Sequence, residues 1–425
     1  MRRGIAATGL IAALAMTAAA CGGDGDGEGD GGSKGGKLSG TVTFWDTSND
    51  AEKGAYEKLA KGFEKLHPDV KVKYVNVPFG EANAKFKNAA GGNSGAPDVM
   101  RTEVAWTQDF ASLGYLAPLD GTAALDKADD YLAQAAASTK FKGKTYAAPQ
   151  TIDTLALFYN KKMLKAAGVD VPTTFDEVKS AAKKIRSKSG KTGLYLRGDD
   201  PYYYLPYLYG EGGDLLDTKS KKVTVDDPEG AKAFSVMKDL VDSKAAVTDA
   251  SDGYNNQLNA FKDGDVAMAL DGPWSIQGAL QGKEFTSDKA NLGVAPAPAG
   301  SARQGAPQGG WNLAAYAGSG NLDASYAFIK YMSSAKVQQQ TTEQLSLLPT
   351  RTSVYDVKSV KDNQMVQFFK PAVEKSVQRP WIPEANALFE PIRLQLEKVL
   401  SGKASPEKGA QGIGDAYRKL LKGYK

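Results

Sequence analysis

The sequence of 425 residues contains one cysteine and one histidine. A single cysteine excludes an intrachain disulfide, a cysteine-rich zinc site and a cysteine-ligated iron–sulfur cluster. A single histidine, His67, removes the commonest general base and metal ligand from most active sites that could be considered. The composition therefore argues against most metal and acid–base chemistry, and we expect no cofactor and no metal site.

The chain also lacks a strong excess of charge. It has 53 basic and 49 acidic residues, a formal net charge of +4, so we expect no broad field that would hold nucleic acid. Hydrophobic residues make up 42% and charged residues 24%, as in ordinary soluble proteins. The length predicts more than one domain.

Only one long uncharged apolar run is present, residues 5–20, and it follows Arg2 and Arg3. This run is short for a membrane span, which needs about 20 residues. Small residues at positions 18–20 then precede Cys21. The layout is typical of a secretory signal peptide, which we place at residues 1–20.

Cys21 follows these small residues in a pattern that resembles a bacterial lipobox, although Ala18 stands where leucine is commonest. In a lipobox the signal peptidase cleaves before the cysteine, which then carries the lipid. A diacylglyceryl group would supply the second acyl chain that stable anchoring needs. We therefore expect lipidation of Cys21 and a location on the outer face of the cytoplasmic membrane. The alternative is an incidental cysteine in an ordinary signal peptide.

Residues 21–37 are rich in glycine and acidic residues and contain nothing that could join a core, so they predict a flexible tether. From residue 38 onward, strand-like and helix-like segments alternate. Residues 52–66 have apolar side chains at helical spacing, and residues 70–74 alternate as a half-buried strand does. This order predicts an α/β fold with two lobes. The apolar face of the first helix consists of Tyr56, Leu59, Phe63 and Leu66.

Three segments carry more specific information. Residues 157–168 lead from a strand into an amphipathic helix that Gly168 ends, and the next helix begins at Thr174 with Glu177 three residues later. Residues 261–274 predict a helix end, a turn, a buried strand and a Gly-Pro turn. Residues 96–100 predict a short strand that leads into a loop.

Together and in this order, the three segments resemble the extracellular solute-binding proteins of carbohydrate ABC importers, specifically the maltose/maltodextrin-binding branch. The resemblance implies the type II periplasmic-binding-protein fold, in which a hinge joins two α/β lobes and the sugar binds in the cleft between them. It implies an N-terminal lobe formed by residues 38–151 and 305–357. The C-terminal lobe would be formed by residues 152–304 and 358–425.

The resemblance also implies a function. The protein would be a receptor, not an enzyme, that binds maltose or maltodextrin and delivers it to permease subunits in the membrane. The chain has no complete P-loop, so ATP hydrolysis would belong to a separate subunit. We expect a monomer that is held at the membrane by its lipid alone.

A sugar has C–H faces that pack on aromatic rings and hydroxyl edges that need hydrogen-bond partners. Trp274 matches the stacking tryptophan of the family, and its alternative role is core packing. Asp200 and Tyr202 match an acid–Pro–Tyr element that contacts sugar. Asp153 matches a carboxylate near the crossing between the lobes, with helix or strand capping as the alternative.

Glu103 and Trp106 are the candidate contacts in the other lobe. The best-known maltose binders carry a tryptophan and an aspartate where this chain has Thr102 and Ala105. The same residue types are therefore present but shifted. Asn49 lies where the family has polar ligand contacts, and turn chemistry explains it equally.

Trp311, Arg351 and Phe389 complete the candidate ligand-binding residues. Trp311 follows two glycines that would let its ring approach a ligand closely. Arg351 could bond a hydroxyl or form an ion pair between segments. Phe389 aligns with the last tryptophan of the family, and the nearby Trp381 could replace it or pack in the core.

Three alternatives remain open from the sequence. The ligand could be another oligosaccharide, such as trehalose, cellobiose or a xylo-oligosaccharide. A surface glycoside hydrolase needs only two carboxylates, so the scarcity of histidine does not exclude one. A structural or adhesive lipoprotein would not need aromatic and acidic residues gathered at loop ends.

Overall fold

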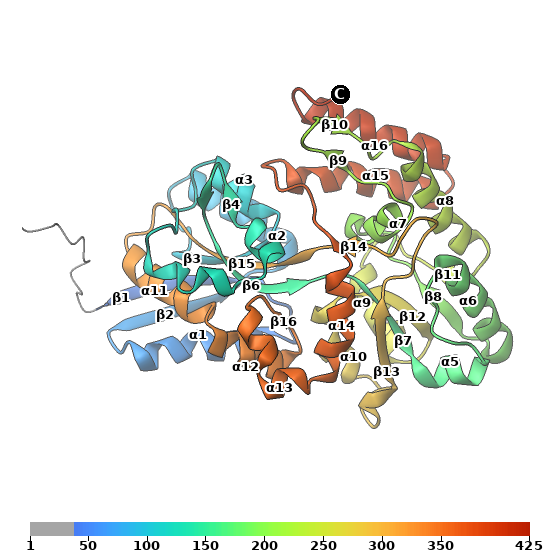
Figure 1. The fold of residues 1–425 in the computed structure, drawn as a ribbon, viewed down its shortest axis with the longest axis horizontal. Helices are drawn as coiled ribbons and strands as arrows, with labels where there is room; N and C mark the ends of the chain where they lie inside the picture. The colour runs from blue at the N-terminus through green and yellow to red at the C-terminus, as the bar shows by residue number, and fades with distance from the viewer. Residues whose placement is uncertain (1–37) are drawn as a thin grey trace, which may run out of the picture. The chain divides into compact units, whose positions relative to one another are not determined.

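The computed structural model describes residues 38–425, so the predicted signal peptide, tether and Cys21 lipidation site lie outside the described residues. The strands form two larger sheets, which Figure 1 shows side by side. The first sheet has the strand order β16 (Leu348–Pro349), β6 (Ala148–Asp153), β15 (Gly309–Ala315), β3 (Val99–Glu103), β1 (Gly40–Asp46) and β2 (Val70–Asn76). The second has the order β11 (Ala246–Val247), β8 (Thr192–Tyr195), β12 (Val266–Asp271), β7 (Ala156–Asn160) and β13 (Leu292–Pro296).

Both sheets combine parallel and antiparallel neighbours. In the first sheet, β1 is parallel to β2 and β3, whereas β15 lies antiparallel between β3 and β6. In the second, β12 is parallel to β8 and antiparallel to β7. Two-stranded pairs add β4 (Lys140–Phe141) with β5 (Lys144–Thr145), β9 (Leu216–Asp217) with β10 (Lys222–Val223), and β14 (Ala306–Pro307) with β17 (Ser376–Val377).

Helices accompany each sheet, which confirms the predicted α/β class with two lobes. The stretches of chain that supply the first sheet contain α1 (Lys53–Leu66), α2 (Phe79–Gly91), α3 (Trp106–Ser112), α4 (Ala133–Ala137), α11 (Leu322–Met332), α12 (Ala335–Leu345) and α13 (Lys358–Lys361). The rest of the described chain contains α5 (Lys161–Ala167), α6 (Phe175–Ser189), α7 (Leu205–Gly210), α8 (Pro228–Asp242), α9 (Gly253–Lys262), α10 (Ile276–Leu280), α14 (Gln364–Glu374), α15 (Phe389–Leu400) and α16 (Pro406–Leu420).

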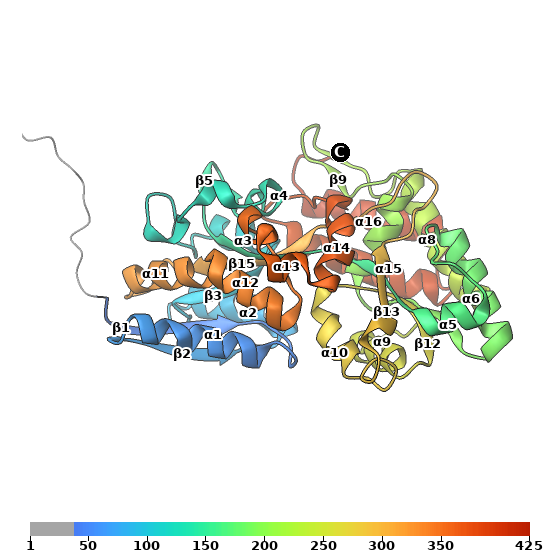
Figure 2. The same cartoon turned by 60° about the horizontal axis from the view of Figure 1, so that its bottom comes forward.

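Each sheet has its own apolar core. Phe63 of α1 and Phe328 of α11 pack together against strands of the first sheet. In Figure 2 these two helices lie beside β1 and β2, whereas α5 and α6 lie at the opposite end of the view. A third cluster joins strand residues of both sheets, such as Ile152 and Phe158, to Phe369 of α14. The exact residues at which the two lobes should be divided stay a prediction.

The first predicted helix is confirmed except at its end. Tyr56, Leu59 and Phe63 are buried in α1, as their spacing predicts. Leu66 was expected on the same face, but it is 64% exposed. It is the last residue of the helix, and the chain turns at His67 into β2, so the side chain extends beyond the layer that covers the sheet.

Two helix termini follow the predicted signals. Gly168 ends α5 with a φ of 67°, a left-handed conformation that suits glycine. Thr174 begins α6 through a capping box: its hydroxyl accepts from the Glu177 amide at 3.1 Å, and the Glu177 carboxylate accepts from the Thr174 amide at 3.2 Å.

The capping box gives a direct test of local stability. Thr174→Ala leaves the Glu177 amide without its side-chain acceptor at the start of α6. We expect the free energy of unfolding to fall by about 1 kcal/mol. Urea denaturation of the purified protein would measure this loss, and Thr174→Ser, which keeps the hydroxyl, should cost clearly less.

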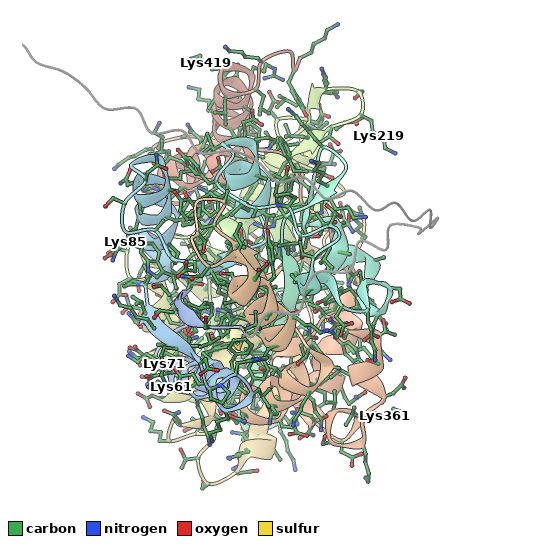
Figure 3. The ribbon with its side chains drawn as sticks, turned by 90° about the vertical axis from the view of Figure 1, so that its left-hand side faces the viewer. Lys61, Lys71, Lys85, Lys219, Lys361 and Lys419 are labelled. Atoms are coloured by element: carbon green, nitrogen blue, oxygen red, sulfur yellow. The ribbon has the colours of Figure 1, made fainter. Side chains whose placement is uncertain are left out.

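Basic side chains divide between the surface and the interior. The lysines labelled in Figure 3 are exposed on the outside of the fold. In contrast, Arg101, Arg351 and Arg379 are buried. Burial of a guanidinium requires partners, so these three arginines mark organised polar sites. Within residues 38–425, no helix is both long and apolar enough to cross a membrane.

Candidate functional site

Three chain segments pass between the sheets near one another. The first joins β6 to β7 at Asp153, and the second leads from β13 through β14 to β15. The third contains β17, which pairs in parallel with β14. These crossings place the carboxyl ends of β1, β3 and β6 opposite the second lobe. Ligands of α/β proteins bind at the carboxyl ends of strands.

Side chains from both lobes meet at this position. Asn49 donates from Nδ2 to the carbonyl oxygen of Trp274 at 3.2 Å. Trp106 donates from Nε1 to Oδ1 of Asn386 at 3.1 Å. Each bond joins residues more than 200 positions apart in the sequence. The structure therefore brings Asn49, Trp106 and Trp274 to the interface between the lobes.

Three rings form an aromatic group on the first lobe. The rings of Phe79 and Trp106 are nearly parallel, with centroids 5.4 Å apart and an interplanar angle of 13°. Trp311 meets both edge-on, at 5.7 and 6.3 Å. Phe79 is 54% exposed although it is a large apolar side chain. Trp106 itself is 2% exposed, so the accessible part of this group is Phe79 and the partly buried Trp311.

The other lobe carries a second aromatic group. The ring of Tyr202 lies 6.4 Å from that of Trp274 and 6.5 Å from that of Phe389, measured between centroids. Tyr202 and Trp274 are the second residues of short 3₁₀ turns, Pro201–Tyr204 and Pro273–Ser275, that follow the ends of strands. Other tyrosines of the same segment, such as Tyr204, are buried in the core, as helical spacing predicts.

Buried hydrogen bonds fix the turn that carries Trp274. The carboxylate of Asp271, at the end of β12, accepts from the Gly272 amide and the Ser275 hydroxyl, both at 2.8 Å. It also accepts from Nε2 of Gln257 at 2.9 Å. This set of bonds holds the Gly-Pro turn, so the position of the indole is predetermined.

Glu103 forms an ion pair that spans the crossing. Its carboxylate pairs with Nη2 of Arg379, and Nε of Arg379 donates to the carbonyl oxygen of Gln308 at 3.0 Å. The Arg379 guanidinium also lies 5.4 Å from the Tyr202 ring and 5.6 Å from the Phe389 ring. Arg379 therefore connects the acidic residue of one lobe to the aromatic group of the other.

Asp153 is buried at the end of β6, with 7% of its surface exposed. Burial, and secondarily the charge of Glu103, raise the pKa of its carboxyl to about 7, while Arg379 and Arg101 oppose this shift. A β-carbon on Gly309 would lie 2.1 Å from Oδ1 of Asp153, so only glycine fits there. The close packing holds the carboxyl at the crossing.

A second polar cluster lies beneath Trp311. The guanidinium of Arg101 stacks between the rings of Trp311 and Tyr56, at 4.1 and 4.6 Å. Asp46 lies 3.9 Å from Arg101. Burial raises the pKa of Glu52 to about 7; the charge of Arg101 is the largest opposing effect.

The raised pKa of Asp153 predicts a pH-dependent stability. A carboxyl with a folded-state pKa above its unfolded value contributes stability that is full below 3.8 and is lost as pH rises through about 7. The free energy of unfolding of the wild-type protein should therefore fall between about pH 5 and about pH 8. In Asp153→Asn it should fall by less. Urea denaturation at both pH values would measure it. Equal losses in the two proteins would contradict the prediction.

Asp200 lies on the second lobe, directly before the 3₁₀ turn that contains Tyr202. Its Oδ1 accepts from the Tyr202 amide at 2.9 Å and so begins the 3₁₀ turn. Its Oδ2 lies 3.4 Å from Nη2 of Arg197, which also pairs with Asp199 at 2.7 Å. The carboxyl therefore orients Tyr202, and 38% of its side chain remains accessible.

Arg351 is placed elsewhere, and the structure does not support it as a ligand contact. Its side chain is 4% exposed, its guanidinium lies 4.1 Å from the Tyr131 ring, and it forms an ion pair with Asp130 at 3.6 Å. The arginine therefore joins internal segments of the first lobe. Its hydrogen bonds, of 2.7 to 3.0 Å, go to the carbonyl oxygens of Asp126, Lys127 and Ser333 and to the Tyr131 hydroxyl.

Sequence reasoning missed several residues at the interface between the lobes. Arg379 and Asn386 lie in the segment that was considered only for its rings, and their partners are distant in sequence. Arg101 directly follows the segment 96–100 that predicts a strand, and no local pattern marks it as a buried cation. Phe79 begins α2 directly after Pro78, and an aromatic residue at the end of the loop after β2 was a signal that could have been used.

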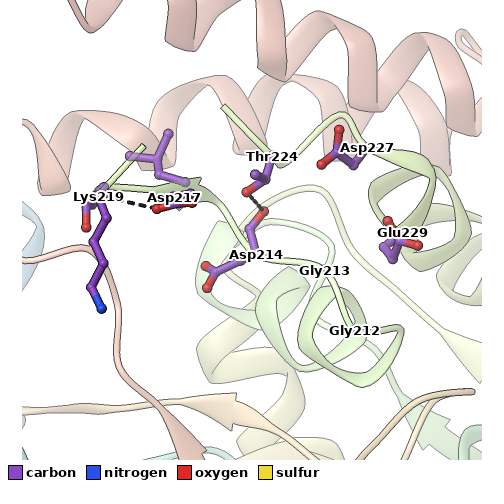
Figure 4. A pocket seen from close by; sticks show the side chains of 10 residues that line it. Gly212, Gly213, Asp214, Asp217, Lys219, Thr224, Asp227 and Glu229 are labelled. Atoms are coloured by element: carbon purple, nitrogen blue, oxygen red, sulfur yellow. Dashed lines mark hydrogen bonds between the residues drawn. The ribbon is translucent and has the colours of Figure 1, made fainter. Parts of the chain in front are cut away.

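A separate surface hollow lies beside the β9–β10 hairpin (Figure 4). Its volume is about 460 Å³, and no predicted site residue lines it. Local bonds shape it: the Thr224 hydroxyl donates to the carbonyl oxygen of Asp214 at 2.9 Å, and the Asp217 carboxylate accepts from the Lys219 amide at 2.9 Å. Within residues 38–425, no group of three or more histidine, cysteine or acidic residues is arranged to hold a metal ion.

A family model described as bacterial extracellular solute-binding protein matches residues 47–339. The chain belongs to this family. The predicted identity as a solute-binding protein of the carbohydrate ABC importer type is thereby confirmed at the family level.

Known relatives extend the comparison. The diacetylchitobiose-binding protein of Streptomyces coelicolor is 28% identical, over 99% of each chain. The maltotriose-binding protein of Pyrococcus abyssi is 26% identical, over 85% of this chain and 78% of its own.

One solved structure is much more similar to this chain than these two relatives are. The GacH receptor of Streptomyces glaucescens, determined unliganded and in complex with acarbose and an acarbose homologue, is 73% identical. The match covers 91% of this chain and all of that one, with a TM-score of 0.90. A maltose-bound MalE3 of T. maritima is 25% identical with a TM-score of 0.81. These likenesses confirm the type II fold of this solute-binding protein.

Proposed function

We propose that the protein is the receptor of a sugar ABC importer and that it binds a malto-oligosaccharide or an acarbose-type oligosaccharide in the interlobe cleft. The observation that carries the proposal is the pair of aromatic groups on opposite lobes, Phe79–Trp106–Trp311 and Tyr202–Trp274–Phe389, with carboxylates between them. Rings pack on sugar faces and carboxylates accept from hydroxyls. The maltotriose-binding and acarbose-binding relatives support this choice of ligand.

The proposed ligand contacts are the cleft residues of both lobes. Arg351 is left out, because its donors are engaged in internal bonds. The Trp381 ring centroid lies 5.6 Å from the Arg379 guanidinium, as that of Phe389 does, so the two rings flank the same cation. The binding residues proposed are therefore Asn49, Glu103, Trp106, Asp153, Asp200, Tyr202, Trp274, Trp311 and Phe389.

Binding would work by closure of the lobes. The hydrogen bonds Asn49–Trp274 and Trp106–Asn386 form only when the lobes meet. A ligand that contacts both aromatic groups binds the closed state more tightly and shifts the population toward it. The permease would then recognise the closed arrangement, and no covalent step is required of the receptor.

Titration calorimetry tests the proposal. The panel should contain maltose, maltotetraose, acarbose, trehalose, cellobiose and a xylo-oligosaccharide. We expect saturable heat with maltotetraose or acarbose and weaker or no binding of cellobiose and the xylo-oligosaccharide. Absence of binding to every sugar would contradict the receptor role. Shortened oligosaccharides after incubation would instead indicate the glycoside hydrolase.

We further propose that Cys21 carries the lipid that holds the receptor on the outer face of the membrane. The lipobox-like sequence supports this, as does the lipoprotein name of a maltooligosaccharide-binding relative from Streptococcus pneumoniae that is 23% identical. Cys21→Ser should abolish incorporation of labelled fatty acid and release the protein into the medium. Unchanged labelling would contradict lipidation at this residue.

A further inference from the structure

Arg101 is a buried cation that packs against a ring of the proposed binding site. It belongs to β3, and none of its surface is exposed. Its guanidinium lies 4.1 Å from the centroid of the Trp311 ring and 4.6 Å from that of the Tyr56 ring. Because Arg101 has no accessible surface, it cannot itself touch a ligand between the lobes.

Hydrogen bonds account for only part of the position of this guanidinium. Its Nε donates to Oε1 of Gln150 at 2.8 Å, and its Nη2 donates to the Tyr56 hydroxyl at 3.3 Å. The carboxylate of Asp46 lies 3.9 Å from Nε. Nη1 is buried and has no hydrogen-bond partner within residues 38–425. An unpaired buried donor is costly, so the contacts with the two rings must contribute to holding the group where it lies.

The backbone that carries Trp311 is irregular. Gly310 has a φ of 139°, and the register between β15 and β6 shifts between Trp311 and Asn312. An irregularity of this kind redirects a side chain out of the regular alternation of a strand. Trp311 is also only partly buried. Neither a regular strand register nor complete burial therefore fixes the orientation of the indole.

A guanidinium is suited to fixing an aromatic ring. The face of a tryptophan ring attracts a cation, and the planar group of arginine can also stack on it. The ammonium group of lysine carries the same charge but is compact and cannot stack. A ring that already has its bound orientation loses less freedom when a ligand arrives, which increases affinity.

We propose that Arg101 is a positioning residue for ligand binding, which holds the indole of Trp311 in the orientation in which the ring packs on a sugar. The inference rests on the proposed function, because it explains how one binding residue of that site is held. It assigns a role in binding to a residue that does not contact the ligand.

Arg101→Lys tests this role, because it keeps a positive charge near Asp46 and removes the planar group. We expect the affinity for maltotetraose and for acarbose, measured by calorimetry, to fall about fivefold. In a Trp311→Leu background the same substitution should change the dissociation constants by less than about twofold, because the ring through which Arg101 acts is missing.

Arg351→Lys is the matched control. The guanidinium of Arg351 is also buried and also lies 4.1 Å from an aromatic ring, that of Tyr131. Its hydrogen bonds remain inside the first lobe. This substitution removes a stacked guanidinium of the same kind, and the dissociation constants should stay within about twofold of wild type.

Fluorine NMR follows the ring itself in the absence of a ligand. The chain contains five tryptophans, so labelling with 5-fluorotryptophan introduces five fluorine nuclei. The Trp311 resonance is identified as the one that is missing from Trp311→Leu. We expect Arg101→Lys to shift or broaden this resonance, and Arg351→Lys to leave it unchanged.

Two results would overturn the positioning role: an unchanged Trp311 resonance in Arg101→Lys, or an equal loss of affinity with and without Trp311. If no sugar binds the wild type, the proposed function fails instead, and a changed resonance would still show that Arg101 holds the ring. If thermal unfolding shows that Arg101→Lys does not fold, Gln150→Leu takes its place. It removes the acceptor of Arg101 Nε together with a buried Nε2 that has no partner within residues 38–425. It should alter the same resonance, and an unchanged one would contradict the proposal.

Discussion

Trp274→Ala is expected to weaken oligosaccharide binding by at least about thirtyfold. The indole lies beside Tyr202 in the second aromatic group, and Asp271 fixes its turn, so the unsubstituted ring needs no reorganisation to meet a sugar. Loss of a central tryptophan in a binding site costs about 2 kcal/mol or more. Titration calorimetry with maltotetraose or acarbose would measure the change.

A matched control separates the binding effect from general loss of an aromatic ring. Tyr326 of α11 is half-buried like Trp274 but packs on the core of the first lobe. Tyr326→Ala should leave the dissociation constant within about twofold of wild type, whatever it does to stability. If Trp274→Ala binds as tightly as the control, Trp274 does not stack on the ligand.

Arg379→Met is expected to lower the free energy of unfolding by about 3 kcal/mol. Arg379 and Glu103 have side chains that are 4% and 15% exposed, so the substitution leaves Glu103 charged in a poorly hydrated position. Guanidinium chloride denaturation at neutral pH would measure the loss.

The charge explanation has its own test. If the cost comes from the unpaired carboxylate, Arg379→Met combined with Glu103→Gln should recover a large part of the stability that Arg379→Met alone loses. A double variant as unstable as the sum of both single variants would show that lost packing on Tyr202 and Phe389 is responsible instead.

Local signals in the sequence predicted much of the fold. Gly168 and Thr174 mark helix ends because their roles depend on neighbouring residues alone. Trp274 was predicted at a strand end because Gly272 and Pro273 restrict the backbone there. Leu66 was predicted on the buried face but is exposed, since helical spacing does not reveal where the covered layer stops.

The site was less predictable because its contacts join distant segments. Glu103 and Arg379 are 276 positions apart, and no local pattern relates them. Arg351 resembled a loop arginine available to a ligand, yet the fold brings carbonyl oxygens from residues 126 and 127 to its guanidinium. Asp153 could be predicted as a carboxyl near the crossing, but its close packing against Gly309 depends on the register of β15 with β6, which no local pattern shows.

The position of β15 affects the order in which the newly made chain can fold. β3 and β6 belong to the early part of the chain, but they are not neighbours in the sheet and are joined only through β15, which begins at Gly309. The early strands therefore cannot complete their sheet while the later residues are still being synthesised. If the predicted signal peptide directs export, this delay would keep the chain unfolded enough to be threaded through the export channel until most of its length has passed.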